Sequence, residues 1–139
     1  MKITYAHLCD YAMVTQDGKV SAIGIFHNIG CLVFPAMHPV AALAFEIDLI
    51  PAEVGRELRI AIQLTNQDGR MLGKMEGRMV PKGTVPGGEV LHIPQAILLA
   101  GLLRFERAGT YSFDIFVNDH LEYQLPFGVT QATPPAQIA

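Results

Sequence analysis

The segment 109–118 alternates between apolar and polar side chains, and this period of two constrains the fold more than any other feature of the chain. One face would carry Tyr111, Phe113, Ile115 and Val117, and the other Thr110, Ser112, Asp114 and Asn118. This pattern is typical of a strand with one buried and one solvated face. Asn118 and Asp119 are turn residues, and alternation resumes at 121–127. We therefore predict a C-terminal β-hairpin.

The same alternation recurs earlier in the chain, most clearly at 43–49 and 58–64. Asp-Gly pairs at 17–18 and 68–69 favour tight hairpin turns, because glycine accepts the positive φ that such turns need. Further strands are predicted at about 3–14, 20–26 and 70–79. Short strands separated by regular turns predict an all-β fold, a two-sheet antiparallel β-sandwich of about eight or nine strands.

The chain of 139 residues fits one domain, since neither a repeat nor a linker divides it. We predict a single β-sandwich domain spanning residues 1–130 and a disordered C-terminal tail at 131–139. Two prolines and three glycines predict a long loop at 80–88. The segment 97–103 lacks alternation, and the sequence leaves open whether it is a buried strand or a helical turn.

The charge pattern argues against nucleic acid or an anionic membrane as a partner. Ten basic residues are scattered along the chain against thirteen acidic ones, which gives a net charge of −3. Hydrophobic residues reach 50% and charged residues only 17%, so we expect a partner to cover some apolar surface. A homo-oligomer, by default a dimer, is the expected form, with a further protein partner as an alternative. The candidate interface residues are Met71, Met75, Met79, Leu98 and Leu102.

A cytoplasmic location is expected, because polar residues such as His7 and Asp10 stand where a secretory signal would place an apolar run. The chain has two cysteines, Cys9 and Cys31. In a reducing compartment both are expected to be buried thiols. The sequence leaves open whether they lie near each other.

Few residues carry the signature of a chemical site. His7, Asp10 and His92 are the candidate ligand-binding residues, and Asp10 stands out because the predicted strand places it on an otherwise apolar face. No histidine pair has zinc-ligand spacing, so neither a metal site nor a cofactor is predicted. No catalytic residue is assigned, since neither cysteine has a base nearby in the sequence. Glu46 and Asp48 share a strand face, which we interpret as a solvated face.

Four segments together suggest a family resemblance. They are Tyr5-Ala6 with Cys9-Asp10-Tyr11-Ala12, the turn Asp17-Gly18-Lys19, the run Ile23-Gly24-Ile25-Phe26, and the pattern from Phe105 through Gly109 to Val117. With these motifs the chain resembles a family of small bacterial proteins known only as a domain of unknown function. The last pattern is also similar to the end of many immunoglobulin-like sandwiches, which implies a fold and no function.

Three functions fit these observations. The leading hypothesis is a non-catalytic binding or assembly module that acts through homo-oligomer or protein–protein contacts. The alternative is a small-ligand-binding protein or an enzyme, with a pocket near Asp10 or the loop at 80–88. A carbohydrate-binding module is a weaker alternative, because tryptophan is absent and most of the four tyrosines are expected to face the core.

Overall fold

The computed structural model describes residues 1–83 and 88–133. The described residues form an all-β fold with one short 3-10 helix, η1 (Pro51–Glu53). None of them belongs to a helix with the length and hydrophobicity of a membrane span. The strands are β1 (Lys2–Val14), β2 (Val20–Ile25), β3 (Asn28–Cys31), β4 (Ala36–Met37), β5 (Ala42–Leu49), β6 (Leu58–Asn66), β7 (Met71–Met79), β8 (Leu91–Leu98), β9 (Arg104–Phe105), β10 (Gly109–Val117) and β11 (His120–Gln131).

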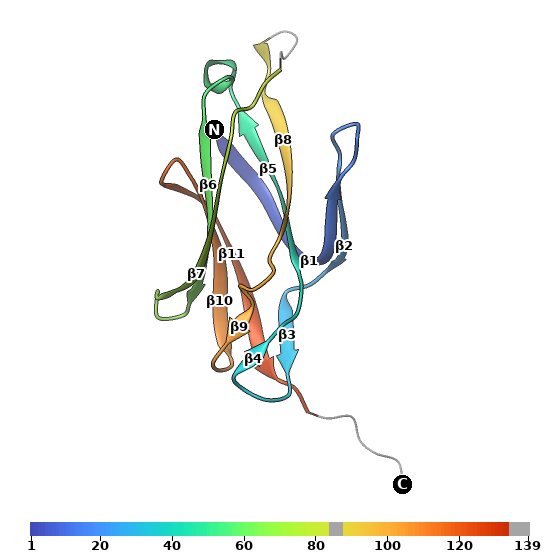
Figure 1. The fold of residues 1–139 in the computed structure, drawn as a ribbon, viewed down its shortest axis with the longest axis vertical. Helices are drawn as coiled ribbons and strands as arrows, with labels where there is room; N and C mark the ends of the chain where they lie inside the picture. Colours follow the sequence, from blue (N-terminus) through green and yellow to red (C-terminus); the bar gives the residue numbers. More distant parts are fainter. Residues whose placement is uncertain (84–87, 134–139) are drawn as a thin grey trace.

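Two large sheets organise the described part of the chain (Figure 1). The first sheet has the order β2-β1-β5-β8, and the second has the order β3-β11-β10-β6-β7. All of these pairings are antiparallel except that of β3 with β11. A small third sheet pairs β4 with β9. The prediction of an all-β fold is therefore confirmed.

The hairpin turns follow the local chemistry of the sequence. Gly18 and Gly69 adopt φ of +84° and +80° in the turns that lead into β2 and β7. Asn118 and Asp119 also have positive φ, at 50° and 69°, and they connect β10 to β11. Asparagine and aspartate tolerate this conformation better than other residues with a side chain. The predicted C-terminal hairpin is therefore confirmed.

The core lies between the two large sheets and takes side chains from both. Leu43, Phe45 and Ile47 of β5 meet the alternating row of β10 in one continuous cluster of buried side chains. Four aromatic rings stack or meet edge to face at one end of this core, with centroids 4.9–5.9 Å apart: Phe105, Tyr111, Phe113 and Phe127. Inward-facing rows that alternate with polar residues are what give each sheet its single buried face.

The far half of β1 leaves the side of β5 and forms a hairpin with β2, which packs on the first sheet through a small cluster of its own. Residues 2–9 of β1 pair with β5, whereas residues 9–14 pair with β2. The β1–β2 hairpin, residues 9–25, stands as an arm beside the outer face of the first sheet (Figure 1). Under the arm, Cys9, Ala42 and Ala44 are buried against Ala12, Val20 and Ala22. These small side chains let the hairpin approach the sheet closely.

One detail of the fold differs from the expectations, and another answers a question that the sequence left open. Asp114 is only 7% exposed, although alternation placed it on the solvated face of β10. Its carboxylate accepts hydrogen bonds from Thr65 Oγ1 at 3.0 Å and Ser112 Oγ at 2.8 Å, and these bonds offset the cost of burial. The segment 97–103 is a strand only through Leu98; a turn follows, from which Leu99 and Leu103 enter the core.

The remaining expectations concern the tail, the long loop and the thiols. Strand β11 continues through Gln131, and residues 134–139 of the predicted tail lie outside the described residues. Residues 84–87 of the predicted loop also lie outside them. Cys9 and Cys31 are both buried free thiols, as expected. They lie on β1 and β3, in different sheets, and burial raises the pKa of each thiol.

Phe113 tests the shared core, because its ring is fully buried and stacks on Phe127. Phe113→Ala should lower the free energy of unfolding by about 3–5 kcal/mol, the usual cost of emptying a buried aromatic site. Leu121→Ala is the control, since Leu121 is exposed and its loss should change stability by no more than about 0.5 kcal/mol. Urea denaturation followed by circular dichroism measures both, and equal effects would contradict the shared core.

Candidate functional site

Three side chains that can ligate a metal or exchange a proton meet on the outer face of the first sheet. Phe45 and Ile47 point into the core, so Glu46 and Asp48 point away from it. Strand β8 pairs His92 directly with Asp48. His92 Nδ1 lies 2.6 Å from Asp48 Oδ1 and 3.4 Å from Glu46 Oε2. We call these three residues the acidic–histidine cluster.

Two groups of the cluster, His92 and Glu46, hold a proton more tightly than they do in water. A hydrogen bond to Asp48 raises the pKa of His92 above its ordinary value of 6.5. Burial, and then the charge of Asp48, raise the pKa of Glu46. The charge of a neighbouring carboxylate contributes to both shifts, together with burial at Glu46 and the hydrogen bond at His92. The arrangement favours a bound proton or another cation.

Two aromatic residues of β1 adjoin the cluster. The pKa of Tyr5 is raised by burial and then by the charges of Glu46 and Asp48, which places its hydroxyl within the field of both carboxylates. The ring of His7 stacks on Tyr5 with the centroids 5.5 Å apart. Of the predicted ligand-binding residues, the structure therefore brings His92 into the cluster and His7 next to it.

Asp10, the third predicted residue, lies elsewhere and is exposed rather than buried in an apolar face. Its carboxylate sits over Gly24, where an added Cβ would come within 2.4 Å of Asp10 Oδ2. Gly24 has φ of +70° and no side chain that could cover the carboxylate. The Asp10 carboxylate therefore stays open to solvent. Asp10 borders a shallow depression of about 290 Å³ that His38 and Asn28 also line. It is not part of the acidic–histidine cluster.

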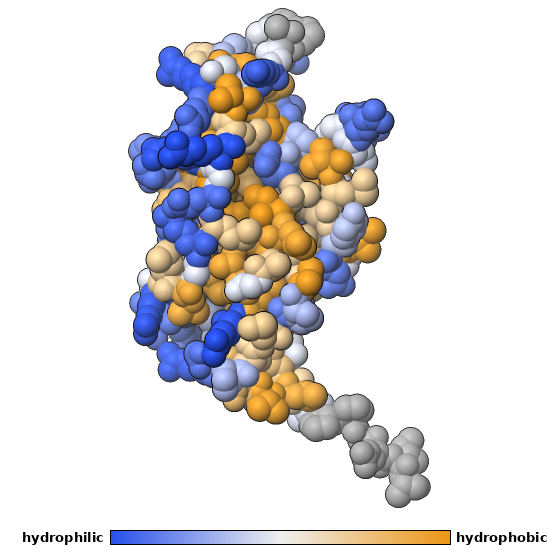
Figure 2. Space-filling view, in the orientation of Figure 1, coloured by the Kyte–Doolittle hydropathy of each residue, from blue (hydrophilic) through white to orange (hydrophobic). Residues whose placement is uncertain are grey.

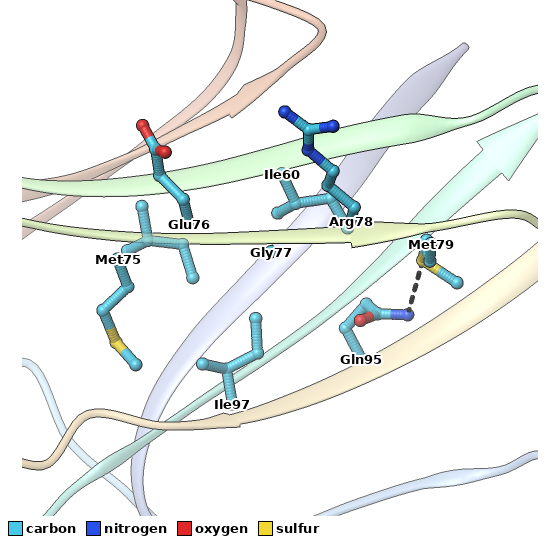
Figure 3. Close-up of a pocket in the computed structure, with 9 residues that line it drawn as sticks. Ile60, Met75, Glu76, Gly77, Arg78, Met79, Gln95 and Ile97 are labelled. Atoms are coloured by element: carbon cyan, nitrogen blue, oxygen red, sulfur yellow. Dashed lines mark hydrogen bonds between the residues drawn. The ribbon is translucent and has the colours of Figure 1, made fainter.

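A separate cleft opens between the edge strands β7 and β8 (Figure 3). Its volume is about 210 Å³, and its floor includes Ile60 and Ile62. Gly77 lies opposite Ile60 and has no side chain to fill the space. Gln95 Nε2 approaches the sulfur of Met79 at 3.6 Å across the opening. The lining is mostly apolar, so this cleft offers contact surface rather than chemistry.

The predicted interface residues divide into two groups. Met75, Met79 and Leu102 are half-buried and pack against the chain's own core. Met71 and Leu98 are exposed. Leu102 also fills the space beside Gly73, where an added Cβ would lie 2.7 Å from its Cδ2.

Sequence reasoning identified His92 but interpreted Glu46 and Asp48 as an ordinary solvated face. Their side chains are only 23% and 14% exposed. Alternation correctly placed both carboxylates on the outer face of the sheet. It contained no signal for the pairing of β5 with β8, which brings in a histidine 44 residues away.

A protein-family model matches residues 4–130 of the chain. The chain belongs to DUF6941, a family of unknown function. The resemblance to a domain of unknown function is thereby confirmed. No curated protein matches this DUF6941 chain.

The raised pKa of His92 gives a pH-dependent test of the cluster. The stability that protonated His92 contributes is fully present below its ordinary pKa of 6.5, and it is lost as pH rises through the raised folded-state pKa. His92→Gln should therefore lower the free energy of unfolding more at about pH 6 than at about pH 9. Asp48→Asn should lower the pKa of His92 in an NMR titration. A His92 pKa unchanged by Asp48→Asn would contradict the paired geometry.

Proposed function

We propose that this DUF6941 protein is a non-catalytic assembly module that forms a homodimer through its β1–β2 arm. The observation that carries the proposal is the exposure of apolar side chains on the arm. Tyr11 and Ile23 are direct partners across the hairpin, and Ile23 is 63% exposed. Met13 and Ile25 extend the same exposed apolar surface. Figure 2 shows apolar surface on the arm, below its polar tip in this view.

The edge of the arm supports self-association. Strand β2 is the terminal strand of its sheet, and its sequence Val-Ser-Ala-Ile-Gly-Ile contains neither a charge nor a proline. Natural edge strands are usually protected by such residues, because an unpaired edge is a template for another strand. An antiparallel β2–β2 pair across a two-fold axis is self-complementary. It would place no like charges of β2 opposite each other.

The other edge strands are less suited to this contact. Strand β7 carries Lys74, Glu76 and Arg78, and β8 contains Pro94 at its centre. Strand β3 has only four residues. Charges, proline and short length are the usual means by which an edge avoids pairing. We therefore place the proposed interface on the arm rather than on the methionine-rich strand β7. Met71 is the most exposed methionine of β7.

The proposal includes an immunoglobulin-like sandwich in a reducing, cytoplasmic setting. The hydroxyl of Tyr111 donates a hydrogen bond to the carbonyl of Arg107 at 2.6 Å. A tyrosine near the start of a late strand that bonds to the backbone just upstream is a hallmark of immunoglobulin-like folds. Two buried free thiols support a reducing compartment.

Native mass spectrometry and sedimentation velocity of the untagged protein test the dimer. The wild type should form a dimer of twice the 15.2 kDa chain mass. Ile23→Lys should shift the population to monomer, because it places a charge in the middle of the edge and removes an exposed apolar contact.

Met71→Lys is the matched control, since Met71 is also exposed, at 51%, and lies on a different edge strand. It should leave the dimer intact. A wild type that stays monomeric at high concentration would refute the assembly proposal. A dimer disrupted by Met71→Lys and not by Ile23→Lys would place the interface on β7.

A further inference from the structure

The acidic–histidine cluster has the composition of a metal site as well as that of an ion-pair network. Among the residues that the structure describes, Glu46, Asp48 and His92 form a group whose donor atoms all lie within 4.8 Å of one another. The donors come from neighbouring strands at positions that the sheet register fixes. We propose that these three side chains bind one divalent transition-metal ion.

The donor separations suit a single ion. Zinc binds carboxylate oxygens and imidazole nitrogens at about 2.0–2.2 Å, so ligands around one ion lie roughly 3–3.5 Å apart. His92 Nδ1 is already 3.4 Å from Glu46 Oε2 and 2.6 Å from Asp48 Oδ1. The separation from Glu46 therefore already suits a single ion, whereas the Asp48 carboxylate would have to move away from His92 Nδ1 to admit one.

The charge balance of the outer face also favours a cation. The carboxylates of Glu46 and Asp48 are largely buried, and in residues 1–83 and 88–133 the salt bridges they form are with His92 alone. Lys2 stands opposite Asp48 in the register of β1 and β5 but forms no salt bridge with it. Two partly desolvated carboxylates thus share one imidazole as their salt-bridge partner. An ion of charge +2 would neutralise both negative charges and offset the cost of their desolvation.

The donor set indicates a transition metal rather than calcium or magnesium. Calcium and magnesium prefer oxygen ligands alone, whereas imidazole nitrogen suits zinc, nickel and similar ions. Three protein ligands leave at least one coordination position free in a tetrahedral site. Because His92 is 59% exposed, that position opens to solvent and would hold water.

The metal site and the proposed dimer contact use different residues, because the cluster consists of Glu46, Asp48 and His92 and the dimer contact is made by the exposed side chains of the arm. Metal and proton compete for the same imidazole nitrogen. Zinc binding should therefore strengthen as pH rises and His92 loses its proton. An ion-pair network alone would show no such zinc affinity.

Isothermal titration of the untagged protein with Zn²⁺ alone tests the site. We expect saturable one-to-one binding that is tighter at pH 8 than at pH 6, with NMR signals of the His92 ring shifting in step. His92→Gln and Asp48→Asn should each weaken binding at least about tenfold, the lower limit for losing even an outer-sphere partner of a metal. Glu46→Gln should act in the same direction.

His120→Gln is the matched control, since His120 is an exposed histidine outside the cluster, at the start of β11. It should leave zinc binding unchanged. The absence of saturable binding would overturn the proposal. So would binding that His92→Gln and Asp48→Asn leave intact, or a loss in His120→Gln as large as in His92→Gln. If circular dichroism shows that Asp48→Asn does not fold, the zinc affinity of His92→Gln decides the test. The His92 side chain is exposed, so its replacement should leave the fold intact.

Discussion

The fold depends on burying one face of each large sheet against the other. Phe45 and Ile47 of β5 belong to the same buried cluster as Phe113 and Ile115 of β10. Successive side chains of a strand point to opposite faces, so a slip of one residue would expose the whole inward row. The inward row of β5 therefore also fixes Glu46 and Asp48 on the outer face. In this way the core determines on which face these two carboxylates lie.

Local patterns were sufficient to predict the longer hairpin strands β1, β2, β5, β6, β7, β10 and β11, but not β8 or the short strands β3, β4 and β9. The hairpin of β10 and β11 and the turns at Gly18 and Gly69 follow from alternation and from residues that accept positive φ. Patterns of neighbouring residues contain no information about partners from distant strands. Alternation alone predicts an exposed Asp114. It contains no information about the hydroxyl of Thr65, 49 positions away, which donates a hydrogen bond to the buried carboxylate. His92 and Asp48 are separated by a similar distance in the chain.

The edge strands show why exposed residues are hard to assign from sequence alone. The methionines of β7 are candidate interface residues by sequence, yet Met75 and Met79 pack against the core. Methionine often fills irregular gaps in this way, and here the space beside Gly77 remains as a cleft. Strand β2 contains no charged residue and no proline. Its lack of charge becomes significant only once the sheet order makes it an edge.

The outer face of β5 is used in two ways along one strand. Ala42 and Ala44 are small, so the arm packs on them and buries them together with Cys9. Glu46 and Asp48 follow on the same face and retain partial exposure. A larger residue at position 44 would push the arm away from the sheet, whereas a change at position 48 would alter the cluster and leave the small-residue packing in place. Side-chain size along β5 thus separates the surface that supports the arm from the surface that carries the acidic–histidine cluster.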